Sequence, residues 1–222
     1  MFLAIDLSMA SLAFAKRKSA QLNIEFMEYA QADILKLKSI GRTFDLIESS
    51  GVLHHLENPF EGWEVLLSIL RPNGLMKLGF YSELARRDIV KVRNLISHNG
   101  IGSTPKDIRN YRKYLLELKS ADGFQFAPNS IDFFSTSACR DLLFHVQEHR
   151  FNLSLLNKFI KDHDLNFLGF EIDRAVIGSY KKQFPTDPSA TNLDLWQRYE
   201  AENPDTFLGM YQFYVQRNNG YY

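Results

Sequence analysis

The chain has 222 residues, of which 45% are hydrophobic and 14% aromatic, so it can bury a sizeable core in one domain that carries an insertion. Its 26 basic residues balance 26 acidic ones, which excludes an overall charge suited to nucleic acid or to an anionic membrane, and we expect neither partner. With Cys139 as its single cysteine, no visible secretory leader and no run of about eighteen apolar residues, the chain is expected to be cytoplasmic.

The first third of the chain alternates strand and helix patterns. Residues 2–5 form an apolar run closed by Asp6, and Ser8 is placed to cap a helix. Residues 24–29 and 44–47 predict two further strands. In a nucleotide-binding α/β unit, an acidic strand end normally follows a glycine-rich turn, yet no glycine precedes Gly41. We therefore expect the strand that carries this turn to be missing.

A second helix and strand follow the loop at residues 49–59. Trp63, Leu66 and Leu70 fall on one helical face, and the turn at residues 71–74 ends that helix. Residues 75–81 then predict another strand. This order of strands and helices predicts parallel strands joined by crossover helices.

The middle of the chain is predicted to be helical. Helices are expected over residues 84–97, from Thr104 onward, and over residues 139–149 and 156–163, whereas residues 121–136 show no clear period. The basic residues of the first of these helices are expected to form its solvated side; they are Arg86, Arg87, Lys91 and Arg93.

The last sixty residues return to an α/β pattern. Residues 166–172 predict a strand, Asn192 can cap a helix, and residues 210–216 alternate as an edge strand would. We expect a mostly parallel α/β sheet that ends in an antiparallel strand. The predicted divisions are a core at residues 1–82, a helical lid at 83–164, and a carboxyl-terminal part at 165–222 that completes the sheet.

Four segments of the first eighty residues resemble successive motifs of class I S-adenosylmethionine-dependent methyltransferases. They are residues 3–8, 32–35, 44–56 and 70–78, and their order and spacing match as well. Residues 80–86 and 135–151 are similar to bacterial methyltransferase-domain proteins. The glycine-rich first motif of the family has no counterpart here. The resemblance implies a Rossmann-like sheet that lacks its first strand and carries a helical insertion.

The resemblance also implies S-adenosyl-L-methionine as cofactor, together with the residues that hold it. Asp6, next to Leu7, would accept hydrogen bonds from both ribose hydroxyls, although a helix-start acid is the alternative reading. Asp33 would meet the adenine amino group and Ile34 would pack on the ring, with a polar turn as the alternative. The backbone that would line the methionine portion belongs to Ser49, Ser50 and Gly51.

The acceptor side is predicted from a different group of residues. Either His54 or His55 could accept a proton near neutral pH, although such a pair often only packs a loop. Tyr81 ends a strand at the same edge and could contact the acceptor. Candidate pocket residues with structural hydrogen bonding as the alternative are Arg140, His145 and His149.

Residues 145–149 also fit the pattern H-x-x-E-H, which in one class of metallopeptidase holds zinc on a helix. Five residues match such a pattern easily by chance, and we expect no metal here.

The sequence leaves two functions open. The first is methyl transfer to a small molecule or a protein, with the helical lid selecting the acceptor. The second is a truncated, non-catalytic interaction module or partner subunit. A missing central strand leaves unpaired backbone groups on its neighbours, so direct pairing, a partner chain such as a homodimer, or instability must follow.

Overall fold

The computed structural model describes residues 1–117, 131–145 and 147–218, so most of the aperiodic segment predicted at 121–136 lies outside the described residues. The strands are β1 (Phe2–Asp6), β2 (Met27–Gln31), β3 (Phe44–Ser50), β4 (Leu70–Phe80), β5 (Leu165–Phe170) and β6 (Tyr211–Arg217). The helices are α1 (Met9–Gln21), α2 (Pro59–Ser68), α3 (Arg87–His98), α4 (Pro105–Glu117), α6 (Thr136–Phe144), α7 (Leu153–Asp162), α8 (Arg174–Gln183) and α9 (Leu193–Glu202). Short 3-10 turns are η1 (Ile34–Ile40), η2 (Leu53–His55) and η3 (Ile131–Phe134).

The first third folds as the local sequence predicts. Ser8 caps α1, since its hydroxyl accepts the Ser11 N–H at 3.2 Å. Strand β2 begins later than predicted because the chain is still closing α1, and the Ile24 N–H donates to the Ser19 carbonyl at 2.9 Å. Strand β4 begins earlier than predicted, at Leu70, and its register with β3 shifts at a bulge before Leu75.

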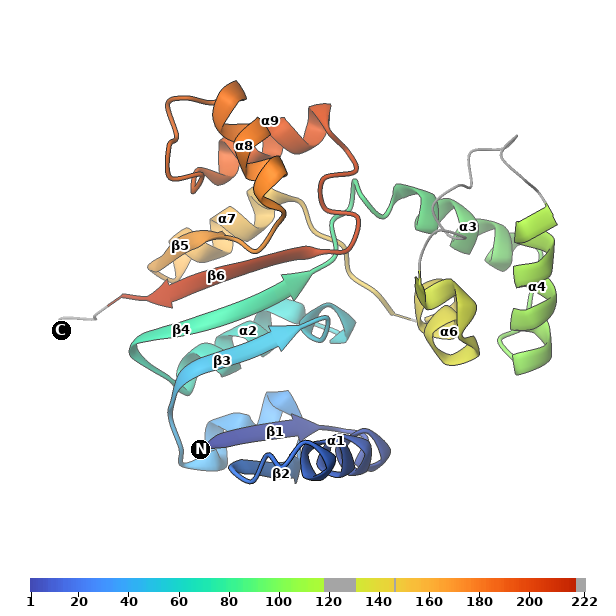
Figure 1. The fold of residues 1–222 in the computed structure, drawn as a ribbon, viewed down its shortest axis with the longest axis horizontal. Coiled ribbons are helices and arrows are strands. Elements are labelled where there is room, and N and C mark those ends of the chain that lie inside the picture. The colour runs from blue at the N-terminus through green and yellow to red at the C-terminus, as the bar shows by residue number, and fades with distance from the viewer. Residues whose placement is uncertain (118–130, 146, 219–222) are drawn as a thin grey trace.

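The strands form two sheets rather than one (Figure 1). One contains β1 and β2 in parallel, and the other has the order β3-β4-β6-β5. Strands β3 and β4 are parallel, whereas β6 is antiparallel to both β4 and β5, so β5 runs in the same direction as β4. The prediction of a mostly parallel α/β sheet with an antiparallel final strand is therefore confirmed.

The two sheets are separate, with an interruption between β1 and β3. β1 and β3 run in the same direction on neighbouring sheets, and each pairs on one side only among the described strands (Figure 1). The two strands do not pair directly with one another. Instead, η1 connects the small sheet to the rest of the molecule by packing against α2.

Aromatic side chains dominate the main core. Trp63 of α2 stacks on Phe159 of α7 at 4.1 Å between ring centroids and packs against Phe80 of β4 at 5.4 Å. In the carboxyl-terminal part of the chain, the Trp196 ring of α9 stacks on the Tyr180 ring of α8 at 3.9 Å between centroids. Helix α8 was not predicted, although Asp173 caps it through the Ala175 N–H at 2.7 Å. These contacts hold the carboxyl-terminal helices on the four-stranded sheet.

Helices α3, α4 and α6 form a separate helical unit with its own core, and it lies beside the sheet in Figure 1. Ile89, Ile108 and Cys139 are fully buried in that core. Helix α7, which the predicted lid also includes, packs instead against β5 and α9. Within the described ranges, no helix is long and apolar enough to cross a membrane.

The predicted helix over residues 139–149 is wrong at its end, and its residue 146 lies outside the described residues. Helix α6 ends at Phe144, and His145 has extended backbone angles. From there the chain turns back to the main sheet, where the His149 N–H donates to the His54 carbonyl and the Phe151 N–H to the Tyr81 carbonyl, both at 2.9 Å. Pairing with distant backbone outweighs the local helical pattern here.

Candidate functional site

A cavity of about 270 Å³ lies between β1 of the small sheet and β3 of the four-stranded sheet, and residues along both strands line it. Its wall includes five of the seven residues predicted to hold the cofactor, namely Asp6, Leu7, Asp33, Ile34 and Ser49. Most of the remaining wall is apolar and comes from β1, β3, η1 and α2. The carboxyl ends of β1 and β3 therefore face one cavity, as expected where open parallel sheets bind ligands.

Asp6 is the last residue of β1 and is exposed at this edge. Its Oδ1 accepts the Ser8 N–H at 2.7 Å, just before α1 begins. The carboxylate thus has the helix-start role that the sequence offered as an alternative, and it also lines the cavity. Because a carboxylate has two oxygens, the helix-start contact leaves Oδ2 able to accept from a ligand.

Asp33 and Ile34 lie where β2 passes into η1. The Asp33 Oδ1 accepts the Leu35 N–H at 3.0 Å and caps η1, which is the turn role considered as its alternative. Both side chains are half-buried, and both line the cavity. The capping contact holds Asp33 in place beside the apolar surface that Ile34 provides.

The end of β3 carries two hydroxyls without partners. The Oγ atoms of Ser49 and Ser50 are buried and make no hydrogen bond to any described residue. Next to them, Gly51 has φ = 76°, a left-handed conformation that favours glycine, and its N–H donates to the Gly79 carbonyl at 3.2 Å. Buried hydroxyls normally have a partner, so this strand end favours a polar ligand or water. Ser50 and Gly51 do not line the cavity itself.

The predicted acceptor residues form a ring cluster beside this strand end. The His54 ring lies 4.0 Å from Tyr81 and 4.3 Å from His55, and the His55 ring lies 4.1 Å from His145. Tyr81 follows β4, while His54 and His55 belong to η2 after β3. Elements distant in sequence thus bring four of the predicted residues together.

His54 and His55 differ in burial and in the partners of their rings. His54 is fully buried. Burial, together with the nearby charges of His55 and Arg86, lowers the pKa of His54 to about 3, and the Gly79 backbone opposes this only in part because it favours the charged ring. His55 is half-buried, and burial lowers its pKa as well, partly offset by the Gln147 backbone. Both imidazoles are therefore neutral near pH 7.

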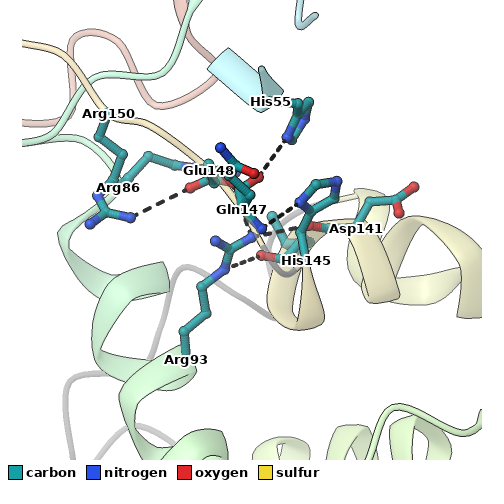
Figure 2. A network of polar contacts seen from close by, with 9 residues as sticks. His55, Arg86, Arg93, Asp141, His145, Gln147, Glu148 and Arg150 are labelled. Carbon is teal, nitrogen blue, oxygen red and sulfur yellow. Dashed lines mark hydrogen bonds and ion pairs between the residues drawn. The ribbon is translucent and has the colours of Figure 1, made fainter. Parts of the chain in front are cut away.

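The tautomer of His55 follows from its hydrogen bond (Figure 2). Its Nδ1 lies 3.1 Å from the Gln147 carbonyl oxygen, which can only accept, so we assign the proton to Nδ1. The lone pair then lies on Nε2. A neutral imidazole with a free Nε2 can accept a proton from a bound acceptor.

The three remaining predicted residues are placed differently. The His145 Nδ1 accepts the Gln147 N–H at 3.2 Å, and the His149 ring lies 3.4 Å from the Gln147 side-chain amide, so both belong to the cluster through Gln147. Arg140, in contrast, donates to the Ser103 carbonyl at 3.0 Å within the helical unit. The structure brings Arg140 into no contact with the histidine rings among the residues it describes.

The zinc pattern at residues 145–149 lacks the helix that it requires, because α6 ends before it. Its glutamate, Glu148, forms ion pairs with arginines instead of facing the histidines as a base would. No group of three or more potential ligands for a metal ion occurs in the described part of the chain.

The sequence reasoning missed an ion network centred on Glu148 (Figure 2). The Glu148 side chain is 1% exposed, and its Oε2 accepts from Arg86 at 2.6 Å and from Arg93 at 3.0 Å. Arg86 also lies over the Tyr81 ring at 3.5 Å, and Arg150 lies 3.9 Å from Oε1. Of the four basic residues predicted to be solvated, Arg86 is 4% exposed and the Arg93 side chain is 15% exposed, so the prediction is wrong for these two.

The burial of Arg86 and Arg93 has a tertiary cause. Arg86 is the N-cap of α3, and Arg93 lies two helical turns further on, so both side chains reach the segment that supplies Glu148. The spacing of Arg86 and Arg93 by seven residues was the only pattern that could have suggested a shared acidic partner. The network joins α3 to the chain that returns from α6 to the sheet.

Comparison with known proteins agrees with this geometry. Residues 1–76 match the family model described as a methyltransferase domain. This match covers the first third of the chain. An uncharacterized protein of Synechococcus sp. is 26% identical over 231 residues, and the match covers 97% of this chain and 54% of that protein.

Solved structures extend the likeness to the whole fold. PKMT2 from Rickettsia typhi in complex with AdoHcy has a TM-score of 0.64 at 16% identity, covering 98% of this chain and 44% of that chain. A second structure of PKMT2 from Rickettsia typhi gives a TM-score of 0.65 at the same identity, covering 97% of this chain and 44% of that one. The fold is that of class I methyltransferases, and the chain spans about half the length of these relatives.

Proposed function

We propose that this protein transfers a methyl group from S-adenosyl-L-methionine to a small-molecule or protein acceptor. One observation carries the proposal: five residues that the family motifs assign to the cofactor line one cavity between β1 and β3. The AdoHcy bound by the structural neighbour from Rickettsia typhi supports the same choice of cofactor.

The residues at the cavity suit the parts of this cofactor. Asp6 would hold the ribose through its second carboxylate oxygen, and Asp33 would accept from the adenine amino group while Ile34 covers the ring. The unpartnered hydroxyl of Ser49, which lines the cavity, suits the charged methionine portion. When bound, the cofactor supplies an electrophilic methyl group on a sulfonium.

The ring cluster would serve the acceptor. His55 presents a neutral Nε2 that can take a proton from an acceptor amine or hydroxyl as it is methylated. Burial raises the pKa of Tyr81, so this phenol stays protonated and can donate a hydrogen bond to the acceptor. His54 is too deeply buried to reach an acceptor and positions Tyr81 by ring packing.

Calorimetry with S-adenosylmethionine and S-adenosylhomocysteine tests the proposal. We expect Asp6→Ala to weaken binding by about 1.5 to 3 kcal/mol, which is the usual contribution of hydrogen bonds to a charged group. Asp45→Ala is the matched control, because Asp45 is an exposed carboxylate near the opposite end of β3 that pairs with Arg71 at 2.8 Å. An equal loss in both variants would remove Asp6 from the site, and no binding at millimolar ligand would refute the enzymatic function for this chain.

The second candidate, a non-catalytic interaction module, is favoured by one observation only, the unpaired edges of β1 and β3. It predicts partner binding without cofactor binding. The same calorimetry therefore separates the two functions, and homodimerisation and a cytoplasmic location stay predictions.

A further inference from the structure

The Tyr81 ring is covered on both faces by side chains from two other elements. The His54 ring of η2 lies 4.0 Å from it between centroids, and the Cζ atom of the Arg86 guanidinium lies 3.5 Å from its centroid. At these distances each group lies over a face, and an imidazole and a guanidinium side by side need more room than one phenol face offers. His54 and Arg86 therefore lie on opposite faces, and the phenol is held between a neutral ring and a cation.

The backbone fixes the position of Arg86 from one direction. Its N–H donates to the Ser82 carbonyl at 3.1 Å at the start of α3. Ser82 is fully buried, and its hydroxyl donates to Glu200 of α9 at 2.5 Å and accepts the Ala85 N–H at 3.0 Å. The turn that joins β4 to α3 is therefore tied to the main core, and it returns Arg86 to the ring of Tyr81.

The side chain of Arg86 is held from another direction by the segment that returns from α6. Its Nη2 donates to Glu148 Oε2 at 2.6 Å, and the same oxygen accepts from Arg93 (Figure 2). The Arg86 Nε, in contrast, is buried and donates to no residue that the structure describes. Because buried donors normally have a partner, hydrogen bonding alone does not account for the place of this guanidinium, whereas contact with the Tyr81 ring does.

The charge of Arg86 also acts on the phenol. Burial raises the pKa of Tyr81, and Arg86 opposes that rise because a cation beside the ring favours the phenolate. The other titratable groups that face the phenol from the elements around it are His54 and His55 of η2, Arg93 of α3, Asp132 of η3 and Glu148. Arg86 has the largest effect of the charged neighbours on the pKa of Tyr81.

We propose that Arg86 is a positioning residue of the acceptor site, which fixes the direction of the Tyr81 phenol and, through its charge, makes the phenol O–H a stronger hydrogen-bond donor. A donor strengthens when a nearby cation stabilises its anion. The inference rests on the proposed function in one respect, which is that Tyr81 contacts the acceptor. Because Glu148 follows α6, the helical unit supports the acceptor site through Arg86.

Fluorine NMR of the whole chain labelled with 3-fluorotyrosine tests the proposal without cofactor or acceptor. The Tyr81 signal is the one that Tyr81→Phe removes, and its change with pH gives the ionisation constant of that phenol. The signals of Tyr180 and Tyr211, which are both fully buried, report whether each variant is folded. Since the readout needs no methyl transfer, its failure and a failure to bind S-adenosylmethionine are separate results.

Variants at two neighbouring positions separate the charge of Arg86 from general effects. Arg86→Met keeps an unbranched side chain without the charge, and we expect the ionisation constant of Tyr81 to fall at least about tenfold. Arg86→Lys restores a cation and should recover part of that fall. The matched control is Arg87→Met, which removes an arginine that is 34% exposed and pairs with Asp205, and it should change the constant less than about twofold. Equal falls in the two methionine variants, or no fall in a folded Arg86→Met, would overturn the proposal.

A measurement that keeps Arg86 covers the case in which Arg86→Met does not fold. Protons over an aromatic face have signals moved upfield by the ring, so the Arg86 Nε–H signal of an isotope-labelled chain should move downfield in Tyr81→Leu. Burial slows the exchange of this proton with water, and Arg86→Lys identifies its signal by removing it. Tyr214→Leu, a change on β6 away from this ring, is the control and should leave the signal in place. An Nε–H signal that stays unchanged in Tyr81→Leu would overturn the proposal.

Discussion

The unit β1-α1-β2 and the four-stranded sheet are built from similar strands and helices, but they differ in burial. Leu12 is the only buried residue of α1, whereas α2 buries Trp63, Val65 and Leu66 among others. Most large apolar side chains that stay exposed in the described residues lie before residue 53. The difference indicates that the apolar side chains of a strand are buried only where neighbouring strands and helices cover them.

The two neighbouring strands β3 and β4 give the sharpest form of this comparison. Leu46 and Leu78 are the same residue type on paired strands, yet Leu46 is 52% exposed and Leu78 is fully buried. We expect Leu78→Ala to lower the free energy of unfolding by about 2–5 kcal/mol and Leu46→Ala by less than about 0.5 kcal/mol. Urea unfolding followed by circular dichroism measures both, and similar losses would contradict the open edge of β3.

Breaking the ion network should have the next largest effect on the free energy of unfolding, because the network joins the helical unit to the sheet through a buried charge. Glu148→Ala would leave Arg86 buried without its partner, and we expect a loss of about 3 kcal/mol in the free energy of unfolding. The matched control is Asp205→Ala, which removes the 65% exposed partner of Arg87 and should cost less than about 1 kcal/mol. A small effect of Glu148→Ala would mean that water reaches Arg86.

His54 should make the stability of the main core depend on pH. Its folded pKa of about 3 lies below the ordinary value of 6.5, so between these values the unfolded chain binds more protons and stability falls as the pH falls. The slope from this one group is at most about 1.4 kcal/mol per pH unit. Urea unfolding between pH 4 and 7 should show a flatter profile for His54→Gln than for the surface variant His98→Gln, and parallel profiles would rule out His54 as the cause.

Removing either of two helix caps should have the smallest effect on stability. Because one cap lies in each region, the two variants compare the regions directly. Ser8 caps α1 and Asn58 caps α2, each through a side-chain oxygen that accepts a backbone N–H. Each alanine variant should lose about 1 kcal/mol locally. In hydrogen exchange, Ser8→Ala should speed exchange only in β1, α1 and β2, whereas Asn58→Ala should also lower global stability. Global loss from Ser8→Ala would show that the small sheet unfolds with the rest.

The helical unit shows where local patterns were insufficient. The sequence predicted α3 and α4 closely, but it extended α6 through residues that return to the sheet. The same error explains Arg86, which has no local reason to be buried. Its partner Glu148 lies 62 residues away, and the extended path of residues 147–151 brings the two together.

By itself, the sequence determined the order of strands and helices and the motifs at the ends of β1, β2 and β3. These features depend on neighbouring residues, through periodicity, capping and turn chemistry. Only the tertiary structure decided that β1 and β3 remain apart, that His54 is fully buried whereas His55 is half-buried, and that Glu148 pairs with arginines. Those outcomes depend on contacts between residues far apart in the chain, where burial and backbone pairing outweigh local preference.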